Sequence, residues 1–248
     1  MRRWLRMLSA AALAGVTAAS VQPRLRGRPH TEPTYDGRFT FVRLRWGSPF
    51  GAGSRGMSSA WNHDYPRAEQ HLTMILKELT LIDTRTDDSL ILTLDDPELF
   101  KYPIAYMWEP GFWAMTDHEA GRFREYLLKG GFAIFDDFEY EQWNHFEAQM
   151  RRVLPGGTFV KLDESHPIFD TFFRMKSIYF PHPMYRITPT YFGIHEDNDP
   201  AKRLMVIANY NNDVAEYWEW SGSGLFPFDT SNEAYKLGVN YMVYGLTH

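Results

Sequence analysis

The sequence of 248 residues contains no cysteine. It can form no disulfide bond, so the folded chain depends on its own core for stability. The absence of cysteine also excludes a thiol nucleophile and a lipid anchor on a diacylglyceryl-cysteine. With 44% hydrophobic and 23% charged residues, the composition is that of a soluble globular protein with a substantial core.

Several motifs of metal, nucleotide and hydrolase sites are also missing. No histidine pair has the H-x-x-x-H or H-E-x-x-H spacing of metal sites, and no G-x-S-x-G nucleophile elbow occurs. GAGSRG (51–56) matches G-x-G-x-x-G in its letters, but a helix is expected only from Pro66. A dinucleotide site needs that helix directly after the glycines, so a loop over a pocket is favoured instead. We expect no cofactor and no metal.

Positive charge is scarce outside the N-terminus. Residues 1–30 contain six arginines and no acidic residue, whereas residues 31–248 contain 20 basic and 31 acidic residues, a net charge of −11. A body with this charge repels phosphate backbones, so we do not expect nucleic acid as a partner.

Residues 1–21 have the three parts of an export signal. Arg2, Arg3 and Arg6 form the charged region, Met7–Gly15 is apolar, and small residues follow. Two alternatives stay open: a cleaved signal peptide, or a retained anchor whose apolar helix leaves the body outside the cytoplasm. We expect an exported protein on the periplasmic side of the bacterial inner membrane, anchored or soluble.

Residues 22–37 are rich in Pro, Gly and Arg and predict a linker, and 38–248 predict a single α/β domain. Strands and helices alternate there with short connections, which is typical of a wound parallel sheet with helices on both faces. Five strands, beginning near Phe39, Leu90, Pro103, Phe132 and Phe159, are expected to be mostly parallel. Residues 203–210 predict a further strand. The expected helices cover 66–80, 116–129, 141–154 and 231–246.

Polar side chains follow these strands at the carboxyl edge of the sheet, where open α/β sheets bind ligands. Asp136 and Asp137 end one strand, and Asp64 and His166 lie in loops that could converge on them. Carboxylates and an imidazole support acid–base catalysis or bind a divalent metal. These four residues are the candidate catalytic residues. The same edge is expected to hold Trp46, Asp95, Asp96 and Glu109.

A structural role is the alternative for the two aspartates. Aspartate at a strand end commonly accepts hydrogen bonds from the loose N–H groups of the next turn or helix. Neighbouring side chains on an extended strand point to opposite sides. We therefore expect one of Asp136 and Asp137 to cap the turn 137–141, and the other to face the sheet edge within reach of Asp64 or His166.

Aromatic residues are unusually common in loops that also contain Gly and Pro, namely WEPGFW (108–113) and EYWEWSGSGLFPF (216–228). Such side chains either fold back onto the core or form a docking surface for a partner. The docking candidates are Trp108, Phe112, Trp113, Trp218, Trp220 and Phe226.

Six segments, in this order, resemble the bacterial family catalogued as domain of unknown function 4159: WNHDYP, YPIAYMWE, LLKGGFAIFDDF, VLP, SHPIF and LGVNYMVYGLT. The resemblance covers roughly residues 38–247. It implies a class I glutamine amidotransferase-like fold, which is similar to a flavodoxin-type sheet. Relatives in that fold that hydrolyse glutamine use a cysteine, so the resemblance implies the fold without the amidotransferase activity.

Two functions follow as hypotheses. The missing nucleophile, the apolar N-terminus and the aromatic loops favour a non-catalytic, membrane-anchored module that serves as an accessory or structural subunit of a cell-envelope membrane complex. The alternative is a hydrolase or carbohydrate-active domain that uses Asp136 or Asp137 with His166 and Asp64.

Overall fold

The computed structural model describes residues 34–47 and 57–248, all within the unit Pro33–His248. The expected N-terminal apolar helix and the GAGSRG loop lie outside the described residues. Within the described ranges, no helix combines the length and the apolar character needed to cross a membrane.

Seven strands of the described chain form one mixed sheet, flanked by helices. Their order in the sheet is β2-β1-β3-β4-β7-β6-β5. The first five in this order run parallel to one another, and β6 and β5 continue the sheet in antiparallel pairs. The strands are β1 (Val42–Arg45), β2 (Leu90–Thr93), β3 (Ile104–Trp108), β4 (Phe132–Phe138), β5 (Val160–Leu162), β6 (Thr190–His195) and β7 (Leu204–Tyr210).

The strand expected to begin near Phe159 forms β5, which lies at the edge of the sheet and does not adjoin the parallel set. It runs in the same direction as β7, because both strands pair antiparallel with β6 between them, and the fifth of the adjoining parallel strands is β7, which the sequence places at 203–210. A parallel pair needs a long crossover, usually a helix, but the segment 163–189 before β6 contains no α-helix. A short connection, 196–203, then returns the chain to β7. The sequence analysis does not predict β6.

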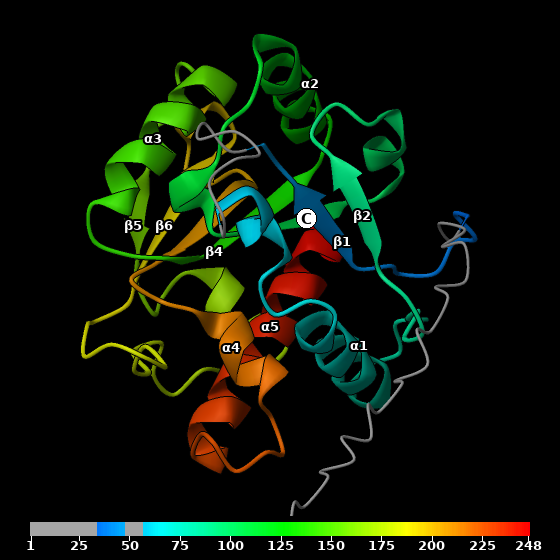
Figure 1. Cartoon of the computed structure of the whole chain (residues 1–248), viewed down its shortest axis with the longest axis vertical. Coiled ribbons are helices and arrows are strands. Elements are labelled where there is room, and N and C mark those ends of the chain that lie inside the picture. Colours follow the sequence, from blue (N-terminus) through cyan, green and yellow to red (C-terminus); the bar gives the residue numbers. More distant parts are fainter. Residues whose placement is uncertain (1–33, 48–56) are drawn as a thin grey trace, which may run out of the picture. The chain divides into compact units, whose positions relative to one another are not determined.

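The helices cover both faces of the sheet, as expected. One buried cluster joins α1, α4 and α5 to one face, and a second joins α2 and α3 to the other (Figure 1). The helices are α1 (Arg67–Leu79), α2 (Asp117–Leu128), α3 (Gln142–Val153), α4 (Val214–Glu219) and α5 (Phe228–Thr247).

Local signals explain where α1 and α2 begin. Pro66 directly precedes α1. The expected capping box starts α2, because the Thr116 hydroxyl accepts from the Glu119 N–H at 3.2 Å and the Glu119 carboxylate accepts from the Thr116 N–H at 2.7 Å. The short helix α4 is not predicted, and α5 begins at Phe228, ahead of the expected Ser231.

The two central strands are buried along their whole length. Every residue of β3 and of β4 is inaccessible or nearly so, as continuous apolar runs between two helical layers require. Strands held this firmly fix the positions of the residues at their carboxyl ends, which include Asp136 and Asp137 in β4 and Glu109 just after β3.

A buried ion pair links β1 to α1. Arg43 is fully buried, and its guanidinium donates to both carboxylate oxygens of Glu69 at 2.9 and 2.7 Å. The same guanidinium lies 3.4 Å from the ring centroid of Trp108. It also donates to the backbone oxygens of Trp61 at 3.0 Å and of His63 at 2.7 Å. Arg43 therefore holds the loop between β1 and α1 against the sheet.

We predict that Arg43→Met lowers the free energy of unfolding by about 3–5 kcal/mol, because it leaves the Glu69 carboxylate buried and unpaired. The matched control is Arg122→Met, which breaks the partly exposed pair with Glu125 and is expected to cost about 0–1 kcal/mol. Urea unfolding of both variants measures the difference. Equal losses in the two variants would contradict the assigned role of Arg43.

Candidate functional site

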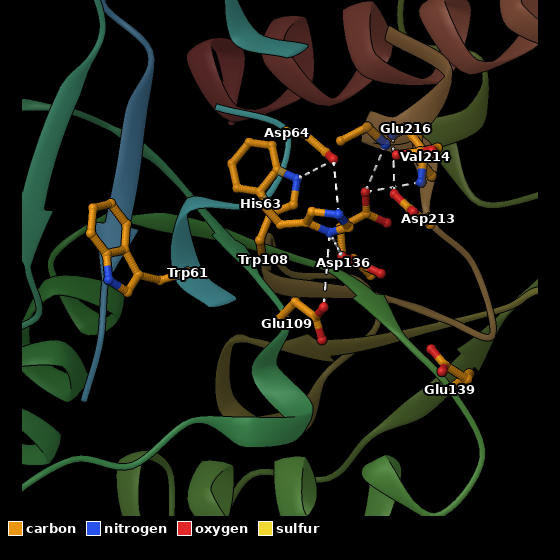
Figure 2. Close-up of polar contacts among 12 residues, drawn as sticks. Trp61, His63, Asp64, Trp108, Glu109, Asp136, Glu139, Asp213, Val214 and Glu216 are labelled. Atoms are coloured by element: carbon orange, nitrogen blue, oxygen red, sulfur yellow. Dashed lines mark hydrogen bonds and ion pairs between the residues drawn. The ribbon is translucent and has the colours of Figure 1, made fainter. Parts of the chain in front are cut away.

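The carboxyl ends of β1, β3 and β4 meet at one edge of the sheet. The strand order reverses at β1, which has β2 on one side and β3 on the other. Open α/β sheets bind ligands at such a switch point. The loop after β1 supplies His63 and Asp64, the residue after β3 is Glu109, and the end of β4 supplies Asp136 (Figure 2). Asp137 follows Asp136 in the same strand.

Asp136 is fully buried and accepts four hydrogen bonds. Its Oδ2 accepts from the Tyr106 hydroxyl at 2.6 Å and from the backbone N–H groups of Val214 and Ala215, both at 3.0 Å. Its Oδ1 accepts from Asn209 Nδ2 at 2.9 Å. One aspartate of the pair therefore caps a helix, as expected, but that helix is α4 and not α3.

Asp137 faces the sheet edge, as expected of the second aspartate. Its Oδ2 lies 2.6 Å from Nδ1 of His63, a short charge-assisted hydrogen bond. Its backbone has φ 62°, and Asp64 and Glu109 also have left-handed backbones, with φ 62° and 52°. Such conformations are uncommon outside glycine and concentrate at functional sites. Three of them here surround a single imidazole.

His63 has a carboxylate beside each of its ring nitrogens. Nε2 lies 3.6 Å from Asp64 Oδ1, and Nδ1 lies 3.8 Å from Glu109 Oε1 in addition to its bond with Asp137. The other oxygen of Asp64 accepts from Trp108 Nε1 at 2.9 Å, which fixes this buried side chain. The His63 side chain is 49% exposed, so a ligand can reach it from solvent.

The cluster can hold a proton or a cation. Among the described residues, two sets of side chains bring ligand atoms within 4.8 Å of one another: His63 with Asp64 and Glu216, and His63 with Glu109 and Asp137. Glu216 comes from α4, the helix that Asp136 caps. The arrangement thus supports acid–base chemistry at His63 and the binding of a divalent metal, although the sequence predicts no metal.

Crowding of negative charge shifts the pKa values in the cluster. The hydrogen bond that His63 donates to Asp137, with the charges of nearby carboxylates, raises the pKa of His63 to about 10. Burial raises the pKa of Glu109 to about 8, and the charge of Asp137 adds to that rise. Burial also raises the pKa of Asp64 well above its usual value. Near neutral pH, His63 is therefore an imidazolium and Glu109 retains its proton.

A comparison with protein families matches residues 40–246 to the family described as Domain of unknown function (DUF4159). The chain belongs to this family. The match includes every residue of the edge cluster, from His63 to Glu216. A search of curated proteins finds no match. Because the description of DUF4159 names no activity, the function is argued from the site.

His166 does not join the cluster in this DUF4159 chain. Its Nε2 lies 3.1 Å from Nε2 of His195, which ends β6 and pairs with Leu204, the first residue of β7. Because β7 begins where the parallel strands begin, His166 lies at the opposite edge of the sheet from Asp136. The expected approach of His166 is wrong because the chain after β5 turns back along β6 and brings His166 to His195, at the end of β6 that lies away from Asp136.

The aromatic docking candidates divide into two groups. Trp108, Trp113 and Trp218 are fully buried, so these side chains belong to the core and offer no surface. Their ring N–H groups explain part of this placement, since that of Trp108 donates to Asp64 and that of Trp218 donates to the Ala234 carbonyl at 3.0 Å. The partly exposed candidates are Phe112, Trp220 and Phe226.

His63 and Glu216 are the cluster residues that the sequence analysis misses. Asp64 of WNHDYP is a predicted candidate and the neighbouring His63 is not, although both follow the same predicted strand. Glu216 lies in a segment that is interpreted as an aromatic loop, and its place at the site depends on the unpredicted helix α4. The adjacent titratable pair in WNHDYP is a signal that could have identified His63.

The histidine pair at the opposite edge predicts a pH dependence of stability. His166 Nδ1 accepts from the Ile168 N–H at 3.2 Å, so its Nε2 carries the proton that is donated to His195. Burial, together with the charge of His195, lowers the pKa of His166 to about 4. An unfolded histidine titrates near pH 6.5, so the unfolded state takes up the proton first, and stability falls as the pH drops from about 6.5 towards 4.

We predict that His166→Asn flattens this fall by roughly 1 kcal/mol, a figure discounted for the partial exposure of the ring. Asparagine keeps the capping of the short helix Pro167–Phe169 and removes the titration. Urea unfolding of both proteins at pH 7, 6, 5 and 4.5 measures the slope. An unchanged slope in the variant would contradict the assignment.

Proposed function

We propose that the protein is a hydrolase whose active site is the cluster around His63 at the carboxyl edge of the sheet. The observation that carries the proposal is the 2.6 Å contact between His63 Nδ1 and Asp137 Oδ2 on a half-exposed imidazole, with Glu109 beside it. A carboxylate that orients a histidine next to a second carboxylate is a recurrent acid–base arrangement. This contact favours the catalytic hypothesis over the non-catalytic one.

The roles follow from the contacts. In hydrolysis, a water molecule adds across the scissile bond of the substrate. Above the pKa of Glu109, about 8, its carboxylate accepts a proton from the attacking water, and the His63 imidazolium donates one to the leaving group. Asp137 acts as a positioning residue, because it holds His63 through Nδ1. No cysteine takes part, so the amidotransferase reaction is not proposed.

Two further features support this proposal. The parallel strands follow the order 2-1-3-4-5 with β7 as the fifth, which supports a flavodoxin-type, class I glutamine amidotransferase-like fold with its ligand at the β1/β3 switch point. Tyr140, just after β4, and Tyr185 are each nearly half exposed, and their rings lie 6.2 Å apart. Exposed aromatic faces at this edge favour a carbohydrate as the substrate class.

The test is a screen of the purified protein against chromogenic glycosides, esters and phosphate esters. We predict turnover of one class, glycosides first, and a loss of about 100-fold or more in both Asp137→Asn and His63→Gln, the range expected for acid–base groups. The matched control is Asp87→Asn, which removes an exposed carboxylate before β2 and leaves the rate unchanged.

Two results would overturn the proposal. One is wild-type protein that turns over no substrate of any class. The other is turnover that Asp137→Asn leaves intact, because the carrying contact would then have no part in the chemistry.

A second candidate function is an exported accessory subunit of a cell-envelope complex, anchored by residues 1–21. The observation that favours it is an apolar pocket of about 720 Å³ between α1 and the start of α5, lined by Ile75, Leu79, Phe173, Phe226 and Phe228 among others. Phe228 is 82% exposed, and exposed apolar patches of this kind mark partner sites.

This candidate predicts that protein extracted from native membranes in mild detergent keeps residues 1–21 and migrates as part of a larger complex. Phe228→Asp should release it from that complex. Leu81→Asp, a change at a fully exposed leucine outside the pocket, should not. Mass spectrometry reads the N-terminus and native gel migration reads the size. A mature chain that begins near Ala19 or Val21 would refute the anchor.

A further inference from the structure

We infer that the Nε2 side of His63 is a binding site for a divalent transition-metal ion, with Asp64 Oδ1 and the Glu216 carboxylate as its other protein ligands. The inference deepens the proposed function and rests on it for the assignment of the edge cluster as the active site. It is argued from three features: the orientation of His63, an unsatisfied oxygen of Asp64, and the placement of Glu216.

The orientation of His63 is set by Asp137. A carboxylate 2.6 Å from Nδ1 keeps the proton on that nitrogen, so in the neutral ring the lone pair is on Nε2. Histidines that bind metals usually donate their other ring N–H to a carboxylate in this way, which fixes the tautomer and the ring plane. In Figure 2, Asp64 and Glu109 contact the ring from opposite sides. Asp137 is thus a positioning residue for the proposed ligand.

Asp64 supplies an oxygen that needs a cation. Its side chain has no exposed area, and Oδ2 accepts from Trp108 Nε1. Oδ1 is buried and has no hydrogen-bond donor among the described residues. A buried carboxylate oxygen without a donor is costly unless a positive charge lies beside it. Without metal that charge is the His63 imidazolium, which is too far from Oδ1 for a hydrogen bond, and an ion that displaces the Nε2 proton would bond Oδ1 directly. Oδ1 is 3.6 Å from His63 Nε2, a separation that fits one ion bonded to both atoms at about 2.1 Å.

Glu216 is the third proposed ligand, and it comes from α4, far in sequence from His63 and Asp64. It lies in the first turn of α4, where its N–H donates to Asp213 Oδ1 at 3.1 Å. Its carboxylate comes within 4.8 Å of the ligand atoms of His63 and Asp64. Two carboxylates this close repel each other unless a proton or a cation lies between them, and a metal ion takes the place of the proton. Because Asp136 caps α4, it places the Glu216 carboxylate beside the Asp64 oxygen that has no hydrogen-bond donor.

The ligand types indicate the class of ion. One imidazole and two carboxylates suit Zn²⁺, Mn²⁺ or Fe²⁺ better than Ca²⁺ or Mg²⁺, which take mainly oxygen ligands. Three protein ligands leave positions for water, as in catalytic sites. A metal there lowers the pKa of bound water and so supplies a nucleophile near neutral pH. With the ion bound, His63 would be a ligand and no longer the proton donor of the metal-free scheme, so Glu109 would accept the proton of the water and pass it to the leaving group.

The test is calorimetric titration of Mn²⁺, and separately Zn²⁺, into the EDTA-treated full chain without substrate. We expect one site per chain, with affinity at least tenfold weaker in Glu216→Gln and in Asp64→Asn. Glu109→Gln should bind the ion nearly as the wild type does. The matched control is Glu139→Gln, which removes a carboxylate from the same sheet edge that belongs to neither ligand set. Thermal unfolding without metal shows that each variant is folded.

Three results would overturn the inference. The first is no binding by the wild type, and the second is an equal loss of metal affinity in Glu139→Gln, which would indicate attraction by charge alone. The third is a loss of metal affinity in Glu109→Gln but not in Glu216→Gln. The last would place the ion on the Nδ1 side. The outcomes also separate this inference from the proposed function. Hydrolysis that persists in EDTA refutes the metal and keeps the hydrolase, whereas metal binding without turnover of any substrate class keeps the site and refutes the hydrolase.

Discussion

The buried carboxylate of Asp136 is the constraint on which the site depends. It accepts from a side chain of β3, a side chain of β7 and the first N–H groups of α4, so one residue joins two neighbouring strands and a helix. Burial raises the pKa of Asp136 to about 6, and the hydrogen bonds that its carboxylate accepts limit this rise. The group is therefore ionised near neutral pH. Because it satisfies the N-terminus of α4, it also sets the position of Glu216. An apolar or amide residue here could not accept all four hydrogen bonds.

Buried polar contacts also place the cluster residues that come from the loop after β1. Arg43, neutralised by Glu69, holds the backbone oxygens of Trp61 and His63 and so fixes the loop after β1. Left-handed backbone conformations at Asp64, Glu109 and Asp137 then turn these side chains towards the His63 imidazole. The outer residues of the site can be exposed and charged because the groups that hold them are buried and paired.

Much of the fold is readable from the sequence because period and capping are local properties. The capping box at Thr116 and the apolar run that forms β4 both have their expected structures. The place of β6 between β7 and β5, and the helix α4, depend on contacts distant in sequence, which no local pattern contains. The same limit explains the site. Asp136 and Asp137 could be located and their divergence foreseen, but the partner of Asp137 is a histidine 74 positions away, and His166 lies against His195 of the unpredicted strand β6.

The central claim is that the carboxyl edge forms one site organised around His63. An anomalous difference map from a crystal grown with Mn²⁺ tests it most directly, since it locates the ion without any assumption about substrate. The account predicts one strong peak about 2.1–2.3 Å from His63 Nε2, Asp64 Oδ1 and a Glu216 oxygen, with Asp137 still bonded to Nδ1. A map with no peak at this edge, or with His63 turned away from Asp137, would contradict it.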